Sequence, residues 1–301
     1  CYNTASGYKA LHLNTTASNN TAVGVCALFA NTTGDINTAT GKGTLKANTT
    51  GSRSAAFGYQ ALLKATTGGF NTGLGAYALS QSTTATQNVA VGTEAMYYNT
   101  TGGCNTASGM RSLHHTTTGH SNVAMGSYSL YANTTGAYNT ATGYQALKSN
   151  TTGAGNTATG KDALKSNTTA SFNTASGYQA LYLNTTGCTN SAFGTEALKK
   201  NTTGCRNTAV GSISLYFNTT GCENTATGHQ ALKCNTTASH NTAYGYTALM
   251  TNTSGCCNTA VGHNTLYGNT TGDWNTAVGK SAMQSNTTGQ RNAAVGMSAL
   301  F

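Results

Sequence analysis

A strict 17-residue tandem repeat constrains this chain more than any other feature. The unit is N-T-A-x-G-x-x-A-L-x-x-N-T-T-G-x-x, and 18 copies follow one another without insertion or deletion, the first beginning at Asn3 and the last at Asn292. A fixed short period predicts a solenoid, in which each copy forms one coil and stacks on the next. Positions within the unit are numbered 1 to 17 from Asn3.

The composition of the repeat indicates strands rather than helices. Each unit has one dependable large apolar residue, at position 9, and is rich in Gly, Asn and Thr, which are poor helix formers. Pro is absent, as expected where the backbone must donate to a ladder. We therefore predict an all-β parallel β-solenoid, a β-roll or β-helix of about 18 coils, which runs through residues 1–301 as one continuous domain. One strand is expected at positions 1–4 and a second at about 8–14, with bends near 5–7 and 15–17.

Several positions hardly vary. Position 3 is Ala except at Gly73, and position 9 is Leu except at Met96 and Met283, so both are expected in a thin core. Position 5 is always Gly, which indicates a backbone angle that only Gly adopts cheaply, or a close approach of the next coil. The first eight of these expected structural-turn glycines are Gly7, Gly24, Gly41, Gly58, Gly75, Gly92, Gly109 and Gly126.

The charge pattern favours a solvated coat over a binding patch for nucleic acid. The net charge is +9, from 15 Lys and Arg against 6 acids, and no basic run is longer than the pair Lys199-Lys200. No apolar run reaches membrane-spanning length, so we expect neither a nucleic-acid partner nor membrane insertion. The chain starts and stops in mid-coil without capping copies, which predicts a segment of a longer fibre or stacking of neighbouring subunits.

The titratable residues do not suggest an enzyme. Asp162 and Glu196 share position 7 but lie two coils apart, and no nucleophile, base and orienting group occur together. His114, His115 and His120 form the one histidine cluster, without the spacing of a metal site, and are interpreted as surface imidazoles. We expect no catalytic activity, no cofactor and no metal.

Position 12 begins the sequence N-T-T or N-T-S in 14 copies, each a formal N-glycosylation motif. These candidate sites are Asn14, Asn31, Asn48, Asn99, Asn133, Asn150, Asn167, Asn184, Asn201, Asn218, Asn235, Asn252, Asn269 and Asn286. Two interpretations remain open, a stripe of glycans along an outer corner and an inward-facing Asn ladder. Ala65, Ser82 and Thr116 replace Asn, yet Thr-Thr still follows each, which favours the ladder.

Three cysteines of the nine occupy position 16 in consecutive coils: Cys188, Cys205 and Cys222. Stacked strands lie about 4.8 Å apart, which is within the Cα separation of a disulfide. A bond between Cys188 and Cys205, or between Cys205 and Cys222, would staple adjacent coils and imply an oxidising compartment. Unpaired thiols at a tolerant corner are the alternative.

The run Asn20-Thr21-Ala22-Val23-Gly24, followed by Ala27-Leu28, resembles the repeats of phage tail-fibre proteins and, more loosely, the heads of trimeric autotransporter adhesins. The resemblance implies a β-roll in an extracellular fibre at a cell or virion surface, assembled as a homo-oligomer. We therefore expect a self-assembling structural protein, either a trimer or a helical filament, with glycans or a cell surface as further partners.

Two other functions are weighed against the structural one. Tyr and His at positions 6 and 10 suit an adhesin or tail-fibre module that binds carbohydrate, although subunit packing also explains them. The Thr columns at positions 2 and 13 suit an ice-binding surface, but Ala55, Val89, Val123 and Ala293 interrupt position 2. The β-propensity of Thr also explains these columns.

Overall fold

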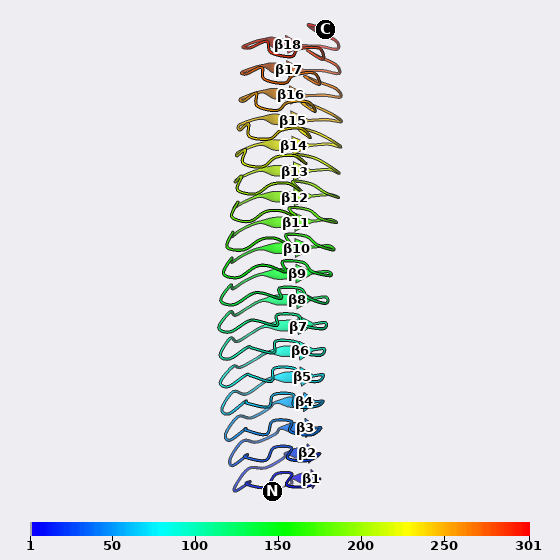
Figure 1. Ribbon diagram of the computed structural model, residues 1–301. Coiled ribbons are helices and arrows are strands. Elements are labelled where there is room, and N and C mark those ends of the chain that lie inside the picture. Colours follow the sequence, from blue (N-terminus) through cyan, green and yellow to red (C-terminus); the bar gives the residue numbers. More distant parts are fainter. Residues whose placement is uncertain (1) are drawn as a thin grey trace. The chain divides into compact units, whose positions relative to one another are not determined.

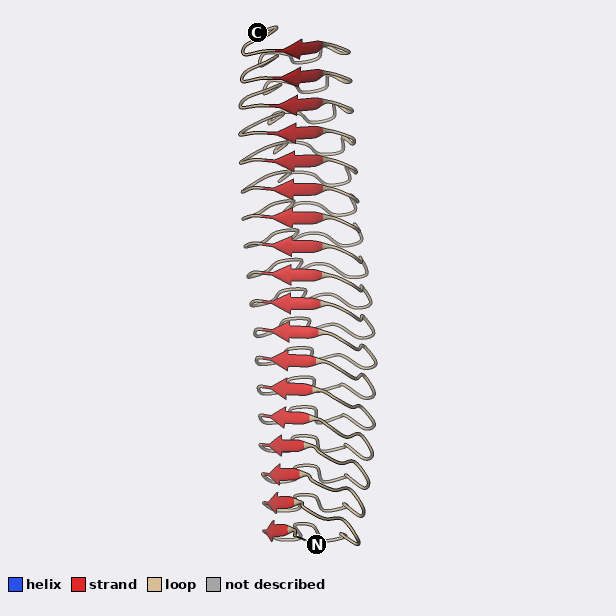
Figure 2. Cartoon of the chain, turned by 180° about the vertical axis from the view of Figure 1, so that it is seen from behind, coloured by secondary structure: helices blue, strands red, loops and turns tan. Residues whose placement is uncertain are grey.

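The computed structural model describes residues 2–301, which form two compact units, residues 2–152 and residues 153–301. Both are built from three-residue strands, one per repeat, joined by loops and turns (Figures 1 and 2). The described residues contain no helix, so the all-β parallel solenoid with one coil per 17 residues is confirmed.

The first unit contains nine strands, β1 (Thr4–Ser6), β2 (Thr21–Val23), β3 (Thr38–Thr40), β4 (Ala55–Phe57), β5 (Thr72–Leu74), β6 (Val89–Val91), β7 (Thr106–Ser108), β8 (Val123–Met125) and β9 (Thr140–Thr142). The second contains β10 (Thr157–Thr159), β11 (Thr174–Ser176), β12 (Ser191–Phe193), β13 (Thr208–Val210), β14 (Thr225–Thr227), β15 (Thr242–Tyr244), β16 (Thr259–Val261), β17 (Thr276–Val278) and β18 (Ala293–Val295). Consecutive strands within a unit pair in parallel with like positions opposite, as Ala22 pairs with Ala39.

The predicted second strand at positions 8–14 is wrong. That segment is a series of turns and bends, in which positions 7 and 9 take left-handed backbone angles, as with Cys26 (φ 57°) and Leu28 (φ 51°). A left-handed residue cannot continue a strand. The segment nevertheless bonds to the next coil, because Leu28 N donates to Thr44 O at 3.0 Å and Ala30 N to Lys46 O at 3.0 Å.

The core is a thin stack of columns. The Ala of position 3, the Ala, Ser or Thr of position 8 and the Leu of position 9 are inaccessible to solvent in the middle coils, as with Ala107, Ser112 and Leu113. Since each Leu lies over the Leu of the neighbouring coil, the apolar side chains form a continuous core only when coils stack.

Two constraints act together on the glycine of position 5. Gly109 has φ +132°, where residues with a side chain are strained. A Cβ on Gly109 would also lie 2.6 Å from the carbonyl carbon of Gly126 in the next coil. Gly is therefore favoured at position 5 both by the backbone angle and by the close approach of the next coil.

We predict that Gly109→Ala lowers the free energy of unfolding of the first unit by about 3 kcal/mol or more, because backbone strain and steric overlap add. Gly73→Ala is the matched control, since its Cβ would meet no atom closer than 3.5 Å and Ala occupies this position in every other coil. Chemical denaturation followed by circular dichroism measures both. Equal effects of the two substitutions would contradict this account.

Candidate functional site

Two asparagine columns close most of the coils. In the second repeat, Asn20 of position 1 and Asn31 of position 12 both donate from Nδ2 to the carbonyl oxygen of Gly34, at 2.9 and 3.0 Å. Asn31 Nδ2 also donates to Asn14 Oδ1 in the preceding coil at 3.1 Å. Asn20 Oδ1 accepts from the backbone N–H of Asn37 in the next coil at 2.8 Å. The same side chains therefore join the two ends of a coil and connect it to its neighbours.

The position-12 asparagines with glycosylation motifs line the interior. Except for Asn14 and Asn286, which are partly exposed, these side chains have relative exposures of 1% or less. An N-glycan replaces a hydrogen of the amide nitrogen that donates to the position-15 carbonyl. A sugar on a folded coil would therefore displace the ladder.

The threonine of position 13 makes a hydrogen bond between coils that the strand propensity of Thr did not predict. Its hydroxyl donates to the main-chain carbonyl of position 13 in the next coil, as from Thr32 Oγ1 to Thr49 O at 3.0 Å. This bond recurs from coil to coil in both units and accounts for a hydroxyl side chain at this position in every copy. The position-13 hydroxyl is consequently engaged within the protein, whereas the Thr or Ser of position 14 is exposed throughout.

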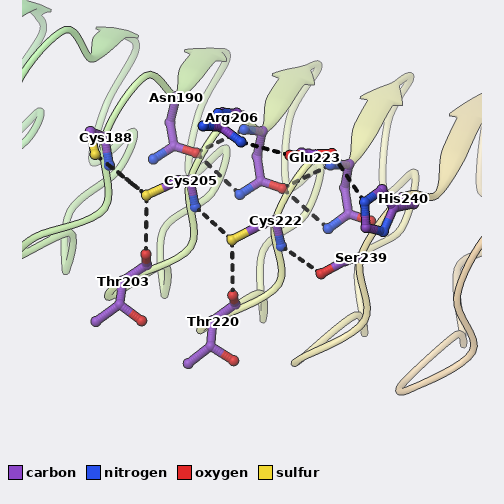
Figure 3. A network of polar contacts seen from close by, with 12 residues as sticks. Cys188, Asn190, Thr203, Cys205, Arg206, Thr220, Cys222, Glu223, Ser239 and His240 are labelled. Atoms are coloured by element: carbon purple, nitrogen blue, oxygen red, sulfur yellow. Dashed lines mark hydrogen bonds and ion pairs between the residues drawn. The ribbon is translucent and has the colours of Figure 1, made fainter.

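The cysteine column in the second unit, Cys188, Cys205 and Cys222, contains no disulfide (Figure 3). The sulfur atoms of Cys188 and Cys205 lie 3.5 Å apart, and all eight cysteines among residues 2–301 are free thiols. The column has a structural use, since the sulfurs of Cys205 and Cys222 each accept a backbone N–H of the preceding coil: Cys188 N donates to Cys205 Sγ at 3.1 Å and Cys205 N to Cys222 Sγ at 3.2 Å. The hydrogen bond between the two thiols raises the pKa of Cys188.

We predict that oxidised glutathione at alkaline pH links Cys188 to Cys205 in preference to Cys205 and Cys222, because the first two sulfurs are already in contact. Peptide mapping by mass spectrometry identifies the product. Cys188→Ser should abolish this cross-link and Cys222→Ser should leave it intact. A dominant link from Cys205 to Cys222 would contradict the prediction.

The acids at position 7 pair with basic neighbours. Glu94 bonds Arg111 at 2.7 Å, Asp162 pairs with Lys165 at 3.1 Å, and Glu196 pairs with Lys199 at 2.6 Å. Within residues 2–301, no group of three or more His, Cys, Asp or Glu side chains is arranged to hold a metal ion.

The interpretation of the histidine cluster as surface imidazoles is wrong for His114, whereas His115 is partly exposed and His120 is exposed. His114 is buried, with 8% of its surface exposed, because it lies between Tyr97 and Tyr131 in a stack of near-parallel rings. The ring centroids are 5.5 Å apart on one side and 5.2 Å on the other. Aromatic residues at position 10 of three consecutive coils were the sequence signal for this stack.

These residues belong to an aromatic–histidine site in the first unit. It comprises Glu94 and Arg111 of position 7, Tyr97, His114 and Tyr131 of position 10, and Tyr98 and His115 of position 11. A second ring stack runs beside the first, with Tyr98 and His115 centroids 5.3 Å apart. Together with Tyr77, these side chains line a pocket of about 520 Å³.

Charge inside the site is balanced. The bond from Arg111 holds the pKa of the Glu94 carboxyl below its ordinary value. Burial lowers the pKa of His114, and the adjacent His115 lowers it further, although His114 Nε2 lies 3.3 Å from Glu94 Oε2. Burial also lowers the pKa of His115. At neutral pH the site thus contains one carboxylate, one guanidinium and uncharged imidazoles.

We predict that the first unit loses stability as the pH falls below about 6.5, the ordinary His value, because unfolded His114 and His115 bind protons before the folded ones do. Denaturation midpoints at pH 7.5 and 5.5 measure the loss. The double substitution His114→Gln, His115→Gln should reduce this difference, whereas His120→Gln, an exposed change in the same coil, should preserve it. Stability that rises on acidification would contradict the sign.

The chain matches no protein-family model and no curated protein. Among residues 2–301 there is no helix with the length and apolar character that a bilayer crossing requires.

Proposed function

We propose that this protein is a structural module, the shaft of an extracellular fibre that assembles from copies of the same chain. The observation that carries the proposal is the bonding between coils. Main-chain donors, two Asn columns and the position-13 hydroxyl all connect one coil to the next within each unit. Opening a coil breaks many of these bonds together, so such a ladder resists extension and proteolysis.

A lateral surface for self-association is available on the outer face of the strands. All 21 charged residues occupy positions 6, 7, 10, 11, 16 and 17, so the strand positions 2 and 4 carry no charge in any coil. Position 4 is apolar or aromatic in 11 of 18 copies and is substantially exposed, as with Phe193 (43%) and Tyr244 (61%). Exposed apolar surface without charges favours association.

The occupant that fits this surface best is a second copy of the chain. Its flat, uncharged rows of Thr, Val and larger apolar side chains are self-complementary, and a homo-oligomer, trimeric or filamentous, would cover them. The resemblance to phage tail-fibre and adhesin repeats supports a location at a cell or virion surface. Glycan decoration is not part of the proposal, because the amide nitrogens that would carry the sugars serve the ladder.

We expect Val210→Glu, on the strand face, to weaken self-association about tenfold or more, since burying an unpaired carboxylate in an apolar interface is costly. Ser212→Glu is the matched control, because position 6 tolerates charge in other coils. Sedimentation velocity over a concentration series measures the assembly. A wild-type chain that stays monomeric at every concentration would overturn the proposal.

A further inference from the structure

The Asn ladder of position 12 is interrupted in one part of the first unit. Position 12 is Asn in all but three coils, and the exceptions, Ala65, Ser82 and Thr116, fall within four consecutive repeats. Met96, one of two replacements for Leu at position 9, lies in the same stretch. Apart from Tyr131, which lies in the next repeat, the residues of the aromatic–histidine site belong to these coils.

Buried polar atoms without hydrogen-bond partners gather in the same part of the first unit. Apart from Asp162 Oδ1, which pairs with Lys165, the buried side-chain atoms that lack a hydrogen bond among residues 2–301 all lie between Asn48 and Thr116. Unsatisfied buried polar atoms lower folding stability. A repeat that is regular elsewhere but suboptimal here is typical of a region under a functional constraint.

One of these atoms belongs to the site itself. His114 lines the pocket, is more than nine-tenths buried, and its Nδ1 has no hydrogen-bond partner. Its other ring nitrogen faces Glu94, which in turn binds Arg111. This polar chain runs beside the stacked rings, from the buried imidazole of His114 to the partly exposed side chains of Glu94 and Arg111.

A second hollow adjoins the pocket. Tyr98 and His115 form a ridge, and beyond it Lys64 and Gln81 of position 11 and the threonines of position 13 line a groove of about 470 Å³. Tyr98 borders both hollows and exposes 43% of its surface. A ligand longer than one ring could therefore contact Tyr98 while occupying both.

The lining indicates the chemistry of such a ligand. Tyrosine hydroxyls, the Glu94 carboxylate, Gln81 and imidazole nitrogens offer many donors and acceptors, while the aromatic rings offer apolar contact. Arg111 is already paired with Glu94, so the pocket beside them provides no free cation for an anionic group, and Lys64 of the adjoining groove does not line the pocket. Polyhydroxylated rings with apolar faces match this combination.

We propose that the aromatic–histidine site binds a neutral oligosaccharide, with one sugar ring in the pocket beside Glu94 and His114 and the next across Tyr98 in the adjoining groove. This inference is independent of the structural function, since a fibre shaft needs no ligand.

Saturation-transfer NMR and isothermal calorimetry on the full chain test the proposal. The probes are neutral oligosaccharides of glucose, galactose, mannose and N-acetylglucosamine, with hyaluronate and heparin fragments as the acidic set. We expect binding of at least one neutral probe, weakened about tenfold or more by Tyr98→Ala and by Glu94→Gln. No binding of any neutral probe, or binding of acidic probes alone, would overturn the proposal.

The second unit offers a matched control. Tyr216 and Phe217 occupy the same positions as Tyr97 and Tyr98, with ring centroids 4.7 Å apart in both pairs, but Ile213 replaces the position-7 acid and Lys233 the stacked histidine. Phe217→Ala should leave binding unchanged. If Phe217→Ala and Tyr98→Ala weakened oligosaccharide binding equally, the assignment of the binding site to the first unit would be wrong. Circular dichroism of each variant distinguishes a loss of binding from a loss of folding.

Discussion

The structure depends on a hydrogen-bond junction at the position-15 carbonyl. In each regular coil, one Asn near the start and another near the end donate to this single oxygen, as Asn190 and Asn201 do to Gly204 at 2.8 and 2.9 Å. A coil of 17 residues with one Leu has too little apolar surface to close on its own. Buried amides do so instead, and stacking satisfies their remaining donors and acceptors.

The side chain at position 15 must be small for the same reason. A Cβ on Gly204 would lie 2.5 Å from Asn201 Oδ1 and 2.4 Å from the carbonyl oxygen of Gly221 in the next coil. Only Gly and Ala occur there in the 17 copies that include this position. The choice of the smallest residues therefore follows from the convergence of two amides on one oxygen.

Much of the fold could be predicted from the sequence because the period was unbroken. The same constraints recur in every coil. Core packing favours Ala at position 3 and Leu at position 9, and the backbone angle and the close approach of the next coil favour Gly at position 5. The turns at positions 6–11 could not be predicted, since Leu28 and its equivalents adopt left-handed angles against their intrinsic preference and are held there by bonds between coils. The hydrogen bond of the position-13 hydroxyl could not be predicted either, because the strand propensity of Thr would by itself explain Thr at this position.

The candidate site was only partly foreseeable. Exposed aromatic columns and the His114-His115 pair were visible in the sequence, but His114 is buried because Tyr97 and Tyr131 cover both of its faces. A more useful signal was the local loss of Asn at position 12. In a chain whose copies otherwise agree, departures confined to neighbouring coils indicate where the shared architecture has been modified.

The identical register of the coils also bears on how such a chain can evolve. Interior asparagines bond their equivalents 17 residues away, as Asn207 bonds Asn190 and Asn218 bonds Asn201, so gain or loss of a whole repeat keeps every column in phase. A change of any other length places an amide opposite a group that it cannot bond. Unequal crossing-over between copies of a repetitive gene changes length in whole units, so the number of coils can be adjusted by recombination while point substitutions act on the outward positions.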